Sequence, residues 1–178
     1  MPEKVTKLVV KDVMGPLPAS GSALVFLLTQ EGRMLALSCC LSDADACRKS
    51  LYGDSDRSNP YHCMIDLLGA VGLELAEARL ETGSSEPYSR ILFKRKEGFP
   101  LKIINPNPMF AVNLSLAAGV QLLGTEALAS RMDVLAHYGH LKSEFQALWP
   151  LSDIKYSGQL AVLSDLMDEV SCEKNLAT

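Results

Sequence analysis

The run ALVFLLTQEGRMLALSCCLSDADACRKSLYG, residues 23–53, contains two apolar stretches, a tight turn and a helical segment. Residues 23–29 and 33–39 flank the turn Gln30-Glu31-Gly32, a pattern typical of a β-hairpin. The apolar run from Ala23 to Leu28 is far too short to span a membrane and fits a buried strand. The segment therefore predicts a hairpin with a buried first strand.

A helix is expected directly after this hairpin. Ser42 has the residue type of an N-cap, and Asp43 and Asp45 fall in the first turn, where the helix dipole favours carboxylates. The helix should run to about Tyr52 and end at Gly53.

Further elements are predicted on both sides of this segment. Strands are expected at 5–14, 73–81, 88–95 and 99–104, and helices at about 61–71 and 109–118. Strands and helices are grouped rather than strictly alternating. We therefore predict an α+β domain over residues 1–130, with a mostly antiparallel sheet and packed helices.

Residues 131–178 have a different pattern. Apolar residues recur at spacings of four and three in two stripes: Val134, Tyr138, Leu141, Phe145 and Leu148, then Tyr156, Leu160, Leu163, Met167 and Val170. Joined by a proline turn, the stripes predict a helical hairpin. It would either pair between chains, giving a homo-oligomer and most simply a dimer, or pack on its own domain.

Composition narrows the function classes. The chain has 178 residues, 17 Lys and Arg against 21 Asp and Glu, a net charge of −4, and only 6% aromatic residues. An acidic chain with few aromatics is unsuited to coating nucleic acid, so DNA or RNA binding is expected to be weak or absent. The sequence shows no export signal and no membrane segment, and a cytoplasmic location is expected.

The cysteines are odd in number and lack the paired spacing of a zinc site. They are Cys39, Cys40, Cys47, Cys63 and Cys172. Reduced, buried and inert thiols are the simplest interpretation.

Three stretches together resemble the bifunctional nuclease domain family, over about residues 7–130. They are LALSCCLSDADACRKSLYG (35–53), PYHCMIDLLGAVGLEL (60–75) and INPNPMFAVNLSLAAGVQLL (104–123), in the order and at about the spacing of the family. The resemblance implies DNase and RNase activity, with Mg²⁺ or Mn²⁺ as cofactor if the site is catalytic. It also places Asp43 and Asp45 at two family glutamate positions and carries His62 and Asp66.

The resemblance fails at the family's RPSDA-type signature. Asn107 and Phe110 stand where Arg and Asp are usual, and Asn105 replaces an acidic residue two positions before that Arg. A phosphodiester hydrolase needs carboxylates for metal or water and cations for phosphate charge. These changes predict a degenerate active site.

The remaining catalytic candidates are Asp43, Asp45 and His62, with the two aspartates as candidate metal ligands. The alternative for the aspartates is a pair of solvated first-turn carboxylates. His62 and Asp66 are four residues apart and could lie on one helix face, either as a catalytic pair or as a local hydrogen bond.

A basic cluster is the candidate nucleic-acid-binding patch. It comprises Arg90, Lys94, Lys96 and Lys102, with Arg95 beside them, and the first three share strand parity. A solvated strand that uses lysine to block aggregation explains the cluster equally well.

Two features of the tail are less specific. Asp133, His137, His140 and Glu144 follow helical spacing, for which a solvated face is the favoured interpretation. The tail is also similar to the UvrB/UvrC-type helical hairpin at Tyr156, Ala161, Leu163, Asp165 and Met167, but Ser164 stands where that motif has Arg.

Two function hypotheses follow. The first is a cytoplasmic nuclease of the bifunctional nuclease family. The second is a non-catalytic, self-associating binding or regulatory domain that uses its helical tail.

Overall fold

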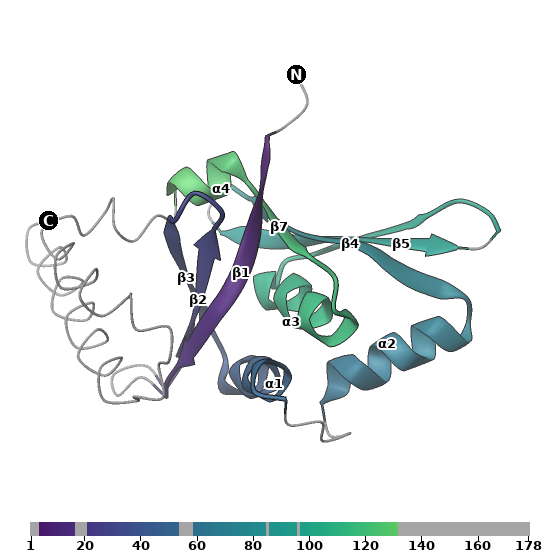
Figure 1. The fold of residues 1–178 in the computed structure, drawn as a ribbon, viewed down its shortest axis with the longest axis horizontal. Coiled ribbons are helices and arrows are strands. Elements are labelled where there is room, and N and C mark those ends of the chain that lie inside the picture. The colour runs from purple at the N-terminus through teal and green to yellow at the C-terminus, as the bar shows by residue number, and fades with distance from the viewer. Residues whose placement is uncertain (1–3, 17–20, 54–58, 85, 96, 132–178) are drawn as a thin grey trace, which may run out of the picture.

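The computed structural model describes residues 4–16, 21–53, 59–84, 86–95 and 97–131 (Figure 1). One seven-stranded sheet has the order β3-β2-β1-β7-β4-β5-β6. Its strands are β1 (Val5–Met14), β2 (Ala23–Thr29), β3 (Met34–Cys39), β4 (Leu73–Thr82), β5 (Pro87–Arg95), β6 (Leu101–Asn105) and β7 (Leu122–Thr125). All neighbouring pairs are antiparallel except β4 and β7. The predicted α+β class with a mostly antiparallel sheet is confirmed.

The helices are α1 (Leu41–Leu51), α2 (Pro60–Ala70), α3 (Pro108–Ala118) and α4 (Glu126–Arg131). Figure 1 shows α1, α2 and α3 close together against the sheet, and α3 contacts both of the other two. Gly119 ends α3 in the left-handed region at φ 65°, which glycine adopts without a Cβ penalty.

The main core lies between this helical layer and one face of the sheet. Leu27, Leu35, Leu80 and Ile91 face the helices from four strands, and Leu114 of α3 packs against them. Since successive side chains of a strand point to opposite faces, the residues between these positions lie on the outer face of the sheet.

Ser42 is not the N-cap of α1, contrary to the prediction. The cap is Cys40 in extended conformation, without a side-chain cap hydrogen bond. The pairing of β3 with β2 continues as far as Cys39, opposite Ala23, so the chain turns into the helix two residues earlier than expected.

β7 and α4 have no counterpart among the predicted elements. β7 has only four residues, yet it joins β1 to β4 in the middle of the sheet. So short an apolar strand carries little periodicity of its own, and its pairing partners identify it. Residues 132–178, including the predicted helical hairpin and its Asp133, His137, His140 and Glu144 edge, lie outside the described residues.

Candidate functional site

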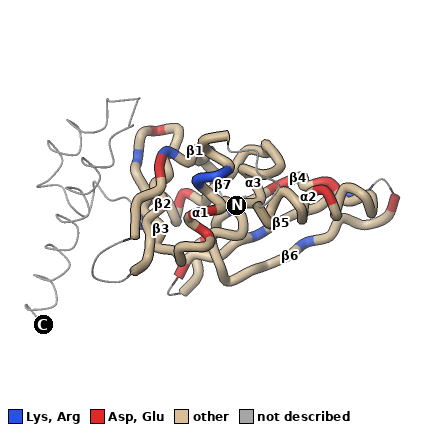
Figure 2. The backbone as a smooth tube through the Cα atoms, turned by 90° about the horizontal axis from the view of Figure 1, so that it is seen from below, with Lys and Arg blue, Asp and Glu red and all other residues tan. Residues whose placement is uncertain are grey.

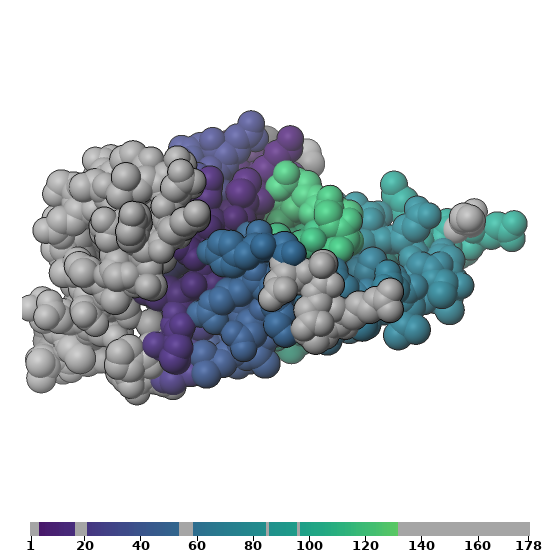
Figure 3. All heavy atoms as spheres, turned by 60° about the horizontal axis from the view of Figure 1, so that its bottom comes forward, coloured from purple at the N-terminus to yellow at the C-terminus, as the bar shows by residue number. Residues whose placement is uncertain are grey.

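Asp43 lies at a junction where α1, α2 and the start of α3 meet, and Figure 3 views the molecule from the side of these helices. The Tyr61 hydroxyl donates to Asp43 Oδ1 at 2.9 Å, and the Asn107 amide donates to Oδ2 at 2.9 Å. The Cys40 thiol also donates to Oδ2, at 3.3 Å. Asp43 is half-buried, and both of its carboxylate oxygens accept hydrogen bonds from neutral groups.

The chain around Asn107 is held by a second set of hydrogen bonds. Asn105 Oδ1 accepts from the backbone N–H of Asn107 at 2.8 Å, and Asn107 Oδ1 accepts from that of Met109 at 2.9 Å, which caps α3. The buried Ser89 hydroxyl of β5 donates to the carbonyl oxygen of Asn107 at 2.7 Å and accepts from the N–H of Ala111. The amide of Asn107 is thereby fixed in position toward Asp43.

Two further side chains close the junction. The Phe110 ring lies 6.2 Å from the Tyr61 ring between centroids, in a tilted arrangement. The buried Asn113 amide donates to the backbone carbonyl of Asp43 at 3.2 Å. We call Asp43, Tyr61, Asn107, Phe110 and Asn113 the polar junction. It joins Asp43 to Asn107 and Phe110, which lie 64 and 67 residues further along the sequence.

The other predicted catalytic residues do not join this junction. Asp45 is exposed and forms an ion pair with Arg48 at 2.9 Å, and Arg48 also donates to the carbonyl of Gly15. His62 is half-buried on α2, and Asp66 is exposed on the same helix. Among the described residues, no group of three or more His, Cys, Asp or Glu side chains is arranged to hold a metal ion.

Sequence reasoning missed Tyr61, Asn113 and Ser89 as site residues. Tyr61 follows Pro60 at the start of α2, and Asn113 is a polar residue within the small-residue helix α3. An asparagine in a mostly apolar helix is the available signal, because an amide that becomes buried requires hydrogen-bond partners. For Tyr61 and Ser89 the sequence offers no comparable signal.

The Tyr61 hydroxyl gives the junction a pH dependence. Burial raises the pKa of Tyr61 to about 12; the hydrogen bond to Asp43 also raises it, and the Asn113 amide lowers it. The folded state holds the phenolic proton more tightly than the unfolded state, so this stabilisation is complete below about pH 10 and is lost as pH rises toward 12.

We therefore expect the free energy of unfolding of Tyr61→Phe to fall less steeply than that of the parent protein between about pH 10 and 12. Urea unfolding at a series of pH values measures both slopes. Burial, and after it the hydrogen bond to Asp12, also raises the pKa of Tyr52 to about 12. The slope of Tyr52→Phe is therefore measured for comparison, as that of a tyrosine outside the polar junction. Equal slopes for the parent and Tyr61→Phe would contradict the expected role of Tyr61.

The cysteines follow the prediction only in part. Cys47 is fully buried, and burial raises the pKa of its thiol to about 12. Burial likewise raises the pKa of the half-buried Cys39 to about 12. Cys40 and Cys63 are exposed, so the expectation that they are buried is wrong: one caps α1 and the other lies on the outer side of α2. None of these four cysteines forms a disulfide within the described residues.

The predicted basic patch lies on the outer face of the sheet. Arg90 on β5 forms ion pairs with Glu77 and Glu81 of β4, both at 2.9 Å. Lys94 and Lys102 are exposed on the same face, and Lys96 lies outside the described residues. Figure 2 shows basic positions spread over several strands. The charge of Arg90 is therefore balanced locally, which weakens the patch as a phosphate site.

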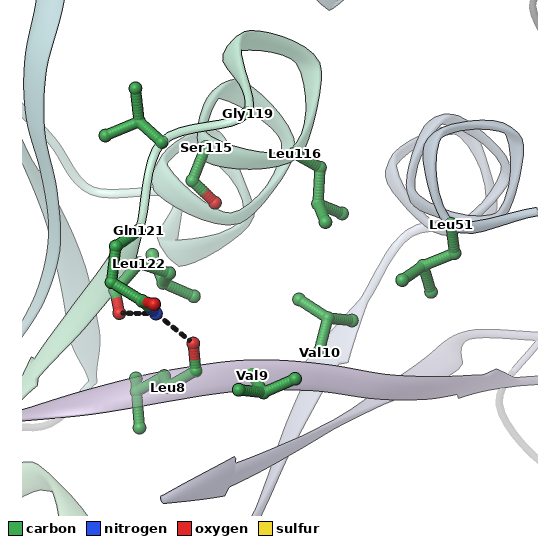
Figure 4. Close-up of a pocket in the computed structure, with 10 residues that line it drawn as sticks. Leu8, Val9, Val10, Leu51, Ser115, Leu116, Gly119, Gln121 and Leu122 are labelled. Atoms are coloured by element: carbon green, nitrogen blue, oxygen red, sulfur yellow. Dashed lines mark hydrogen bonds between the residues drawn. The ribbon is translucent and has the colours of Figure 1, made fainter. Parts of the chain in front are cut away.

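An apolar groove of 370 Å³ lies between β1, the end of α1 and the end of α3 (Figure 4). Val10, Leu51 and Leu116 line it with other aliphatic side chains, and Gln121 donates to the carbonyl of Leu8 at its edge. None of the lining side chains is ionisable. The groove could accommodate an aliphatic group, but it offers no acid–base chemistry.

Comparison with known protein families finds no family model that matches the chain, and comparison with curated proteins finds no match either. None of the described helices is both long enough and apolar enough to cross a membrane.

Proposed function

We propose that this protein is a divergent domain of the bifunctional nuclease type that acts in binding or regulation and does not hydrolyse nucleic acid. The observation that carries the proposal is the polar junction, in which both carboxylate oxygens of Asp43 accept hydrogen bonds from neutral donors. In this arrangement Asp43 ties three helices together. The proposal rests on the resemblance for the family and on the junction for the loss of hydrolysis.

Hydrolysis of a phosphodiester requires groups that offset phosphate charge and activate water. Asn107 supplies a neutral amide at the position where the family has Arg, and the Phe110 ring packs on Tyr61 where the family has Asp. Asp45, the other acidic candidate of the first motif, is paired with Arg48. Catalytic groups act as a unit, so the loss of two members lowers activity far more than either change alone suggests.

A nuclease centred on Asp43 is the second candidate function. It is favoured by one observation: Asp43 and Asn107, which lie in two separate stretches of the resemblance, are in direct contact. If Mg²⁺ or Mn²⁺ binds here, Asp43 is the carboxylate at the junction that would contact it.

Nuclease assays separate the two candidates. We expect purified protein not to cleave single- or double-stranded DNA or RNA, whether Mg²⁺, Mn²⁺ or a chelator is present. Restoring the signature with Asn107→Arg/Phe110→Asp should introduce metal-dependent cleavage, because it returns a cation and a carboxylate to the junction. The single variant Asn107→Arg is the matched control, since it restores the cation alone.

Metal-dependent cleavage by the parent protein would overturn the proposal if Asp43→Asn abolishes it. Asp45→Asn controls for a general loss of acidic charge, because Asp45 is exposed and contacts Arg48 rather than the junction. Cleavage that persists in Asp43→Asn would come from a site elsewhere on the chain or from a contaminant.

As a binding domain, the chain would contact its partner at the apolar groove beside β1, which would accept aliphatic side chains of a protein segment. Nucleic acid is not the proposed partner, because the net charge is −4 and the Arg90 charge is balanced by Glu77 and Glu81. Self-association through the tail stays a prediction of the sequence and is not part of this proposal.

A further inference from the structure

The β1–β3 half of the sheet has an apolar outer face. Strand register places six apolar side chains on this face that we call the outer patch: Met14, Leu24, Phe26, Leu28, Met34 and Ala36. Asp12 and Ser38 share the face, as does Val9, which lies opposite Leu28 and is 50% exposed. The alternate residues of β2, Val25 and Leu27, belong to the main core beneath the helices. β2 is therefore apolar on both faces, as a strand covered on both sides requires.

Two members of the outer patch are fully covered. Phe26 is 0% exposed and Met34 is 1% exposed, yet neither belongs to the main core. On the other half of the same face, Ile104 of β6 is 62% exposed. An aromatic ring on an open sheet face would keep a comparable exposure, so Phe26 and Met34 must be in contact with a further part of the protein.

The described helices do not supply this cover. α1, α2 and α3 pack on the opposite face of the sheet, and the buried residues of α4, Leu128 and Ala129, belong to the main core. Residues 132–178 are the remaining part of the chain that is long enough to cover the outer patch.

The last described helix leads the chain to this region. Arg33, in the turn between β2 and β3, forms an ion pair with Glu126 at 2.7 Å and donates to the Ser130 hydroxyl at 3.3 Å. α4 ends one residue later, at Arg131, so the described part of the chain ends near the turn end of the outer patch. Figure 1 shows α4 beside the ends of β2 and β3.

We infer that residues 132–178 cover the outer patch of their own domain through the apolar stripes that the sequence places at Val134–Leu148 and Tyr156–Val170. Both partners are apolar, and the tail begins close enough to reach the patch within one molecule. The tail is thus part of the domain's second core, and its apolar stripes are not free to pair with another chain.

Methionine oxidation in the full-length chain tests this inference, because a buried thioether is protected from peroxide. In Leu141→Asp/Phe145→Asp, two charges enter the first stripe, and we expect Met34 to oxidise about tenfold faster than in the parent protein. Met109, which is 0% exposed in the main core, should stay protected and reports that the domain is folded. The matched control Gln146→Asp adds a charge beside the stripe and should leave Met34 protected. Unchanged oxidation of Met34 in the double variant would overturn the inference.

A photoreactive residue at Ser38 provides an independent test that needs no destabilising change. Ser38 is exposed and lies on the outer face opposite Leu24. In a mixture of isotopically light and heavy full-length chains, we expect Ser38 to cross-link to residues 132–178 of the same label. The same group at Lys102, on the far half of this face, should not reach the tail. Cross-links between unlike labels would assign the patch to a second copy, and an absence of links to the tail would also overturn the inference.

Discussion

Replacing Phe93 by alanine is expected to lower the free energy of unfolding by about 3–5 kcal/mol. Phe93 of β5 is 1% exposed and belongs to the main core between the sheet and the helices. The lost stability has two sources: the aromatic ring is no longer buried away from water, and a cavity is left in a packed interior. Chemical unfolding followed by circular dichroism measures it.

Phe99→Ala is the matched control. Phe99 is 92% exposed, so its truncation should change the free energy of unfolding by no more than about 0.5 kcal/mol. Equal losses for the two variants would show that Phe93 does not occupy the core position described. The comparison holds the chemical change constant and varies only burial.

Asn59→Ala is expected to lower the free energy of unfolding by about 2–4 kcal/mol, because the buried Asn59 side chain joins α1 to α2. Asn59 is 0% exposed, and its Oδ1 accepts from the N–H of Tyr61 to cap α2. Its amide donates to the carbonyl of Ala46 at 3.0 Å and to the Ser50 hydroxyl at 2.9 Å. Truncation removes the cap and leaves buried polar groups without a partner.

The matched control is Asn107→Ala. Asn107 also precedes a proline and caps a helix, α3, but it is exposed, so water can replace its hydrogen bonds. A loss of about 1–2 kcal/mol is expected there. If both substitutions lower the free energy of unfolding by the same amount, the burial of Asn59 does not add to its contribution to stability. Both variants are compared by urea unfolding at one pH.

Local sequence patterns are sufficient to predict much of the sheet. The strand pattern at 5–14 gave β1 with the same bounds, and the turn Gln30-Glu31-Gly32 gave the β2–β3 hairpin. Period-two patterns and turn residues act over a few neighbours, so they can be read locally. β7 could not be found in this way, because a four-residue strand is defined by its hydrogen bonds to β1 and β4.

The sequence predicted only some members of the candidate site and none of their contacts. The sequence identifies Asp43 as a candidate residue, and Asn107 and Phe110 as departures from the signature of the family that it resembles. Their mutual contacts, and the part played by Tyr61, depend on how α1, α2 and α3 meet. Asp45 was selected on the same grounds as Asp43. It lies two residues further along α1, which turns it away from the junction and toward Arg48.

The sequence by itself determined the α+β class, the hairpin at one edge of the sheet and the identities of Asn107 and Phe110 in a stretch that resembles a nuclease signature. Local patterns and residue identities contain that information. Only the tertiary structure decided that Asp43 is bonded to Asn107 and Tyr61 and that Phe26 is buried on the face away from the helices. Both facts depend on segments that are distant in the sequence, and their positions are set by packing of the whole domain.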